Sequence, residues 1–339
     1  MASRPLFGFT AIAALAAAVG LTGCGTGDDS ELTVYSARQE HLIKPIFDRF
    51  TEETGIPVRY ITDSAGPLME RLRSEGERTR ADILMTVDAG NLYMAADAGL
   101  LRPVDSAVLR ERIPEHLRDP EGRWFGYSVR ARTIIYHPDR VDPANLESYE
   151  GLADRRWRYR LCMRTSQQVY NQSLVATLIA HHGEEHTEET VRGWVANFGA
   201  DPFSNDTSVL NAIRAGQCDV GVTNTYYLGR LLRENPDLPL AVFWPNQDDR
   251  GVHINVSGAG ITQHAKRPDD ALILLEWLAG DEAQALFAAL NLEYPAVEGV
   301  QWDPIVAGWG EFKADTINVA EAGRLQRQAT MLMDRAGYR

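Results

Sequence analysis

Three tyrosines follow short apolar segments of this chain, at places where a helix is expected to begin. Tyr226 and Tyr227 come after the apolar run at 219–222, and Tyr170 comes after a second run at 160–164. Because the carboxyl ends of neighbouring parallel strands meet in one crevice, we expect the three phenols to converge. Phenolate oxygen is a hard anionic ligand, and a trivalent cation supplies the field that lowers the phenol pKa from about 10. The sequence therefore predicts a ferric-iron site.

A single tyrosine at such a place is more often structural than a ligand, but the adjacent pair is harder to explain by packing. Consecutive side chains on a helix diverge by about 100°, so Tyr226 and Tyr227 cannot fill the same slot in a core. At a strand-to-helix turn, both rings can lean over the strand ends.

Two arginines offer a place for an anion beside the cation. Arg130 and Arg132 alternate along an extended segment, so they point to the same face. The guanidinium fork can hold a small anion such as carbonate or bicarbonate, and an ion pair between two lobes is the alternative. Arg38 and Gln39 follow the first expected strand and can join this group from the opposite lobe.

A histidine cluster and Asp88 are further candidate site residues, but a structural role is favoured for each. His182 and His186 stand four residues apart beside His181, which suggests zinc, but Gly183 breaks the helix between them and a solvated helix end is favoured. Asp88 ends a strand, where a helix cap is favoured over a role in the pocket. The chain contains no nucleophile elbow, P-loop or His-Glu-x-x-His motif, and we find no nucleophile–base pair.

The amino terminus has the pattern of an export signal. Arg4 precedes an apolar run at 7–21 that is too short for a stable spanning helix, and residues 21–24 read Leu-Thr-Gly-Cys. This stretch resembles the bacterial lipoprotein processing box, which predicts a signal peptide over 1–24 and a lipidated Cys24. An ordinary secretory signal is the alternative. Residues 25–30 would then be a short tether to a membrane face.

Two cysteines remain in the exported domain, Cys162 and Cys218. Each stands eight residues before a tyrosine of the candidate site, Tyr170 or Tyr226. In an oxidising compartment a disulfide between neighbouring strands would contribute about 4 kcal/mol, and two buried thiols are the alternative.

Length, charge and periodicity define the fold class. A chain of 339 residues suits two lobes, and a net charge of −13 argues against a nucleic-acid partner. Strands expected at 32–35, 56–61 and 81–86 alternate with helices at 41–54 and 68–75, which indicates an α/β fold with a parallel, doubly wound sheet. Segments 124–129 and 133–136 are expected to cross between lobes. The tail at 318–335 is expected to form one long helix.

Several stretches together resemble the periplasmic ferric-ion-binding proteins of bacterial ATP-binding-cassette (ABC) iron transporters, over almost the whole chain from residue 32 onward. The stretches that carry the resemblance are 34–39, 81–88, 124–126, 130–132, 169–173, 224–229 and 309–316. The tyrosine pair is the most specific of them. The resemblance implies a two-lobed type II periplasmic-binding-protein fold, each lobe a doubly wound mixed sheet, that closes over iron in a central cleft.

The resemblance also implies roles for individual residues. Tyr170, Tyr226 and Tyr227 fall on the family's phenolate ligands, and Arg130 falls on the arginine that supports a synergistic anion. Gln39 and Glu40 occupy positions where some members have a histidine or tyrosine ligand, so the chain is similar to a three-tyrosine branch. Glu40 or His41 as a fourth ligand stays open. The pairing of Cys162 with Cys218 is also a feature of that branch.

The implied protein is a lipid-anchored extracytoplasmic receptor, not an enzyme, that delivers Fe³⁺ to an ABC permease in the inner membrane. We expect a monomer with lobes formed by 31–129 plus about 252–300 and by 130–251 plus about 301–339. The alternatives are the same fold binding a small organic or oxyanion solute and, in a different class, an exported metalloenzyme that uses the histidine cluster.

Overall fold

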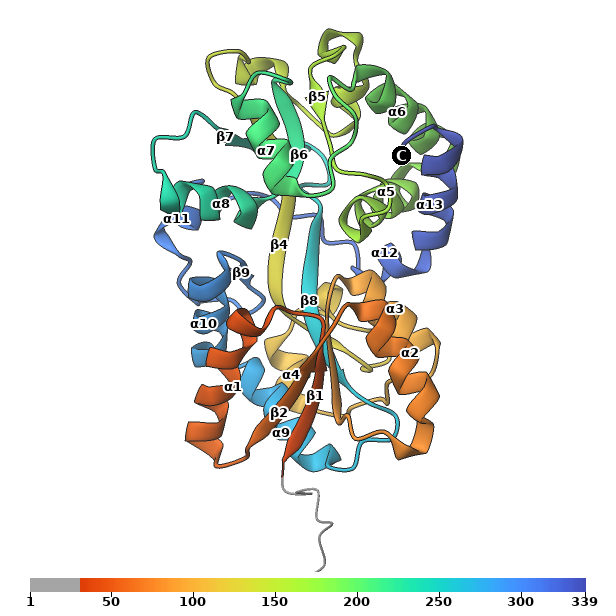
Figure 1. Cartoon of the computed structure of the whole chain (residues 1–339), viewed down its shortest axis with the longest axis vertical. Helices are drawn as coiled ribbons and strands as arrows, with labels where there is room; N and C mark the ends of the chain where they lie inside the picture. The colour runs from red at the N-terminus through yellow and green to blue at the C-terminus, as the bar shows by residue number, and fades with distance from the viewer. Residues whose placement is uncertain (1–30) are drawn as a thin grey trace, which may run out of the picture.

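The computed structural model describes residues 31–339, which form two lobes stacked end to end (Figure 1). The predicted signal peptide, the tether and Cys24 lie outside the described residues. Within the described part of the chain, no helix has both the length and the apolar character needed to cross a membrane.

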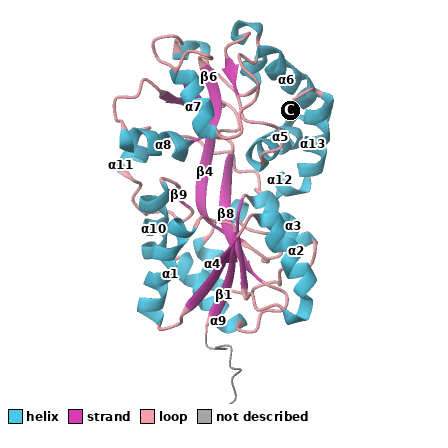
Figure 2. Ribbon diagram, viewed as in Figure 1, coloured by secondary structure: helices cyan, strands magenta, loops and turns pink. Residues whose placement is uncertain are grey.

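A sheet with mixed strand directions runs through both lobes, in the order β2-β1-β3-β8-β4-β6-β5, with β7 and β9 also paired to β4 (Figure 2). β1 is parallel to β2 and β3, and β5 is parallel to β6, but β8 is antiparallel to both β3 and β4. The three strands expected at 32–35, 56–61 and 81–86 are parallel neighbours, as strand–helix alternation predicted, and the antiparallel strands β4 and β8 that connect the lobes make the whole sheet mixed, as the resemblance implied. The strands are β1 Leu32–Ser36, β2 Val58–Thr62, β3 Ile83–Val87, β4 Phe125–Tyr136, β5 Leu161–Cys162, β6 Val220–Asn224, β7 Ala241–Phe243, β8 Ile254–Ile261 and β9 Tyr294–Pro295.

The two segments expected to cross between lobes are one continuous strand, β4. Its first half pairs with β8 in the lower lobe of Figure 1, and its second half pairs with β6 and β7 in the upper lobe. In this register Arg130 lies opposite Asn255 of β8, and Arg132 lies opposite Asn224 of β6. The two arginines are therefore two residues apart in sequence but face partners from different elements.

Helices cover both faces of the sheet (Figure 2). In the lower lobe, α1 buries Ile43, Ile46, Phe47 and Phe50, which recur at the helical spacing and form one apolar face. The helices are α1 Glu40–Thr54, α2 Ala65–Glu75, α3 Ala89–Asp97, α4 Ala107–Arg112, α5 Val169–His182, α6 Glu184–Asn197, α7 Asp206–Arg214, α8 Thr225–Glu234, α9 Pro268–Leu278, α10 Asp281–Asn291, α11 Pro304–Ala307, α12 Ala320–Arg324 and α13 Gln326–Arg335.

The expected single helix at 318–335 is wrong, because the tail forms α12 and α13 with Leu325 between them outside helical geometry (φ −100°, ψ 2°). α12 packs against α3 of the lower lobe and α5 of the upper lobe (Figure 1). Gly323 allows this close approach, since a Cβ atom there would lie 2.3 Å from Cβ of Tyr93. The bend lets α12 contact both lobes while α13 covers the upper lobe.

The structure contains a disulfide between Cys162 and Cys218, with Cα atoms 5.9 Å apart and 56 residues apart in sequence. Cys162 ends β5, whereas Cys218 lies two residues before β6 rather than inside a strand. β5 and β6 are parallel neighbours, so the bond joins the two segments that lead into the tyrosine helices.

Candidate functional site

Two strand-to-helix connections position the three tyrosines. β6 runs directly into α8, whose first turn carries Tyr226 and Tyr227, and a short loop after β5 leads into α5, whose first turn carries Tyr170. Because β5 and β6 are parallel neighbours, both helices start at the same edge of the sheet. The oxygens of Tyr226 and Tyr170 lie 3.4 Å apart, and the ring centres of Tyr226 and Tyr227 lie 4.4 Å apart.

All three tyrosines line one cavity of about 120 Å³. Tyr226 is buried with 5% of its surface exposed, while Tyr170 and Tyr227 are half-buried. Both lobes contribute to the walls, which are formed by Ala37, Arg38, Gln39, Leu42, Val87, Arg130, Tyr170, Tyr226, Tyr227, Arg230 and Glu293. The expected convergence of the phenols with Arg38, Gln39 and Arg130 is present in the structure.

Burial disfavours the ionised form of two of the three phenols, those of Tyr170 and Tyr226. Burial raises the pKa of Tyr226 well above its ordinary value of 10, and the neighbouring tyrosine oxygens raise it further. Burial also raises the pKa of Tyr170, an effect that Arg130 opposes. A strongly charged cation is therefore required to displace the phenol protons and turn the cluster into a set of anionic oxygen ligands.

Arg130 reaches both lobes at the cavity wall. Its guanidinium donates to Ser257 Oγ at 3.0 Å and to the carbonyl of Val256 at 3.1 Å, and it lies 3.8 Å from the Asp88 carboxylate. The guanidinium also lies 5.0 Å from the ring centre of Tyr170. Burial alone would lower the pKa of Arg130, but the Tyr170 and Asp88 oxygens raise it above its ordinary value. The side chain thus remains a cation beside the phenols.

Arg132 does not join Arg130 at the cavity. Its guanidinium is buried within the upper lobe and lies 3.1 Å from the Asp206 carboxylate at the start of α7. Asp206 belongs to the same lobe as the Arg132 guanidinium. Arg132 therefore neither lines the expected anion site nor forms an ion pair between the lobes. Strand alternation alone could not distinguish the two arginines, because their partners come from distant segments.

Two charged cavity residues were missed from sequence, Glu293 and Arg230. Glu293 Oε2 accepts a hydrogen bond from Arg38 at 3.1 Å, although the two residues are 255 positions apart, so no local pattern could have indicated it. The Arg230 guanidinium lies 5.1 Å from the ring centre of Tyr226. Arg230 follows Tyr226 by four residues on α8, and this helical spacing could have indicated from the sequence that the two side chains are neighbours.

Glu40 and His41 do not line the cavity and are both exposed. Glu40 instead accepts a hydrogen bond from the Tyr60 hydroxyl at 3.0 Å on the outer surface. In this conformation the structure brings neither residue to the tyrosines, whereas Gln39 lies at the rim of the cavity.

The histidines form separate polar pairs. His181 lies 2.7 Å from Asp315, and His182 lies 3.0 Å from Glu150. Gly183 separates α5 from α6, as expected, and across residues 31–339 no three His, Cys, Asp or Glu side chains gather in a metal-binding group. Nothing in the described structure places a metal at the histidine cluster.

The expected cap at Asp88 is confirmed, since its carboxylate accepts the Gly90 N–H at 2.9 Å and begins α3. The same carboxylate accepts hydrogen bonds from Ser173 Oγ at 2.8 Å and from Asn255 Nδ2 at 2.9 Å. Asp88 therefore also connects the lower lobe to α5 of the upper lobe, which the sequence did not indicate.

Comparison with known proteins supplies the relatives. The family model "Bacterial extracellular solute-binding protein" matches residues 79–307. "Iron uptake protein A2" of Synechocystis sp. is 43% identical, and the alignment covers 98% of this chain and 96% of that protein. "Iron uptake protein A1" of the same organism is 41% identical, and the alignment covers 92% of this chain and 89% of that protein. A solved Trichodesmium structure, IdiA (FutA) in complex with iron and citrate ligands, superposes with a TM-score of 0.88 at 41% identity and covers 91% of this chain and 100% of that one.

Proposed function

This chain belongs to the bacterial extracellular solute-binding proteins, in the branch of periplasmic ferric-ion-binding proteins, and from this premise we propose that Tyr170, Tyr226 and Tyr227 hold one Fe³⁺ ion as phenolates. The protein is an extracytoplasmic receptor that binds ferric iron and delivers it to an ABC permease. The observation that carries the residue assignment is the 3.4 Å separation of the Tyr226 and Tyr170 oxygens in a cavity that Tyr227 also lines.

The arginines of the cavity would hold a synergistic anion beside the iron. Three phenolates neutralise Fe³⁺, and the remaining coordination positions are open to an anion or water. Arg130 and Arg38, with Gln39 at the rim, supply donors for a small oxyanion, and we propose carbonate or bicarbonate. The Trichodesmium relative contains citrate with its iron, which supports an oxygen-rich anion as the partner.

Closure of the lobes would complete the site. We assign 31–129 and about 252–300 to one lobe, and 130–251 and about 301–339 to the other, with β4 and β8 as the connection. Iron would bind first to the tyrosines, and closure would bring Arg38 and Gln39 over it; the greater affinity of the closed form drives the hinge. Release would follow protonation of the anion or phenolates, or reduction to Fe²⁺.

The periplasmic location follows from membership of the family. The lipid anchor at Cys24 is part of our proposal. Lipidation at Cys24 would hold a monomeric receptor at the membrane face, beside a permease of the inner membrane. Radiolabelled palmitate incorporation into wild type and Cys24→Ser tests the anchor, and equal labelling of both would refute it.

The iron assignment is tested by colour. Wild-type protein titrated with ferric citrate should develop a visible phenolate-to-iron charge-transfer band and an orange-red colour. Tyr227→Phe should lower the intensity and the affinity, because one anionic ligand is lost. A colourless wild type would contradict the iron assignment and favour the small organic or oxyanion solute. A coloured wild type with an unaltered spectrum for the variant would exclude Tyr227 as a ligand. Bleaching by dithionite tests release through reduction.

A further inference from the structure

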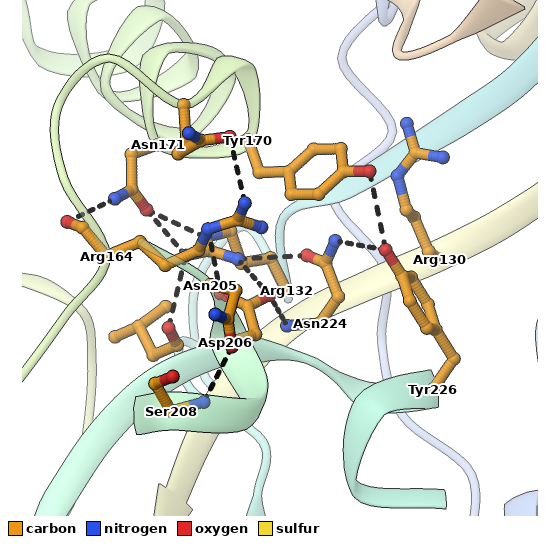
Figure 3. Close-up of polar contacts among 12 residues, drawn as sticks. Arg130, Arg132, Arg164, Tyr170, Asn171, Asn205, Asp206, Ser208, Asn224 and Tyr226 are labelled. Atoms are coloured by element: carbon orange, nitrogen blue, oxygen red, sulfur yellow. Dashed lines mark hydrogen bonds and ion pairs between the residues drawn. The ribbon is translucent and has the colours of Figure 1, made fainter. Parts of the chain in front are cut away.

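A cluster of four buried polar residues lies directly behind the tyrosines and outside the cavity wall (Figure 3). We call it the inner polar cluster; it comprises Arg132, Asn171, Asp206 and Asn224. None of these side chains is more than 2% exposed. Buried groups of this kind are costly unless they are satisfied, so their hydrogen-bond directions are informative.

Arg132 connects the starts of the two tyrosine helices. Its guanidinium donates to Asn171 Oδ1 at 2.6 Å and to Asn224 Oδ1 at 3.1 Å. Asn171 directly follows Tyr170 in α5, and Asn224 ends β6 two residues before Tyr226. The Asp206 carboxylate compensates the buried charge of Arg132 at 3.1 Å and also accepts the backbone N–H of Asn224 at 3.1 Å.

The guanidinium determines which way the Asn224 amide faces. Arginine has only donors, so the atom of Asn224 that faces it must be the oxygen. The amide nitrogen of Asn224 then points to the Tyr226 oxygen, 3.3 Å away (Figure 3). Tyr226 in turn lies 3.4 Å from the Tyr170 oxygen, to which its hydroxyl donates. The direction of donation runs from Arg132 through Asn224 to the tyrosine cluster.

We propose that Asn224, oriented by Arg132, is a positioning residue that donates a hydrogen bond to the iron-bound oxygen of Tyr226. An N–H donor aimed at a phenolate stabilises its negative charge, and it is more effective in a buried, low-dielectric place. The same bond lowers the energy of the phenolate electrons that are transferred to iron on absorption of light. The inference rests on the proposed function, because it requires Tyr226 to be a ligand.

The test compares ferric-citrate spectra and affinities of wild type and Asn224→Leu, which keeps the volume but removes the donor. The charge-transfer band should move to longer wavelength without losing intensity per iron, and binding should weaken roughly tenfold, the effect of one hydrogen bond to a charged group. Asn197→Leu is the matched control: it is a buried asparagine of the same lobe that bonds only the carbonyls of Leu152 and Asp154, so its band should match wild type.

A double-mutant cycle separates the hydrogen bond from general disturbance. In the Tyr226→Phe background, Asn224→Leu should produce no further band shift, because the acceptor oxygen is gone. An unchanged band in Asn224→Leu, a loss of intensity per iron, an equal shift in Asn197→Leu, or a shift that persists without the Tyr226 oxygen would each overturn the inference. If circular dichroism shows that Asn224→Leu is unfolded, Asn224→Ala, which also lacks the donor, is judged by the same criteria. A colourless wild type would instead refute the proposed function itself.

Discussion

The Ser173 hydroxyl donates a hydrogen bond to the Asp88 carboxylate at 2.8 Å, and this bond joins the two lobes. Ser173 lies one turn along α5 from Tyr170, and Asp88 caps α3 beside Arg130. Both side chains are buried, with at most 1% exposed. The helix that carries a candidate iron ligand is therefore tied to the opposite lobe through a buried carboxylate side chain.

Ser173→Ala should weaken ferric binding and favour a more open iron-free form. We expect this bond to form on closure, where a buried hydrogen bond contributes about 1.5 kcal/mol, so the affinity should fall roughly tenfold. Small-angle scattering should show a larger radius of gyration for the variant. Thr177→Val is the control, since its hydroxyl bonds within α5 to the Ser173 carbonyl. Equal effects of the two variants would argue against a role for the lobe contact.

Iron binding should release protons and strengthen as pH rises. Burial raises the pKa of both Tyr226 and Tyr170, so these phenols are protonated at neutral pH in the iron-free protein. Each ligating phenol exchanges its proton for iron, and acid therefore competes with the metal. Competition with nitrilotriacetate, corrected for protonation of the chelator, gives the logarithm of the iron-binding constant at each pH. The slope of this logarithm against pH should be smaller by about one in Tyr226→Phe. Identical slopes would exclude Tyr226 as a titrating ligand.

The stability of the iron-free protein should fall on acidification because of His253. Burial lowers the pKa of this imidazole from 6.5 to about 3, with Arg132 and Arg130 contributing. As the pH falls, the unfolded chain binds the proton before the folded protein does. The contribution of His253 to the free energy of unfolding is therefore complete above pH 6.5 and is lost as the pH falls towards 3. The loss is at most about 1.4 kcal/mol per pH unit. Urea unfolding of His253→Asn should show a flatter dependence between pH 6 and pH 4. His264→Asn, at an exposed histidine, should retain the wild-type slope.

Loss of the disulfide should destabilise the protein and the tyrosine site together. The bond closes a loop of 56 residues, for which the chain-entropy model gives about 4 kcal/mol. Cys162→Ser/Cys218→Ser should therefore shift the urea midpoint downwards, as should reduction of the wild type. Iron affinity should fall less than stability, because pairing of β5 with β6 still places the tyrosines together. A midpoint equal to that of oxidised wild type would contradict the expected stabilisation.

Local sequence patterns identified the elements and much of the candidate site. Apolar spacing predicted α1 and its buried face, and a strand-to-helix position selected Tyr170, Tyr226 and Tyr227, because these signals lie within a few residues of one another. Where a structural feature depends on residues that are distant in the sequence, the local patterns predicted it wrongly or gave no prediction. The tail divides into α12 and α13 because α12 packs against both lobes, and Glu293 reaches Arg38 only through the folded chain.

The sequence by itself determined the donor chemistry: three phenols after apolar strands, arginines on an extended segment and two cysteines at matching spacings. Only the tertiary structure decided what each of these groups faces. Arg130 contacts the cavity and Asp88, whereas Arg132, two residues along the same strand, is buried against Asp206 and orients Asn224. The reason is physical: the energy of a buried charge depends on its nearest partners, and here those partners come from segments that are neighbours only in the folded protein.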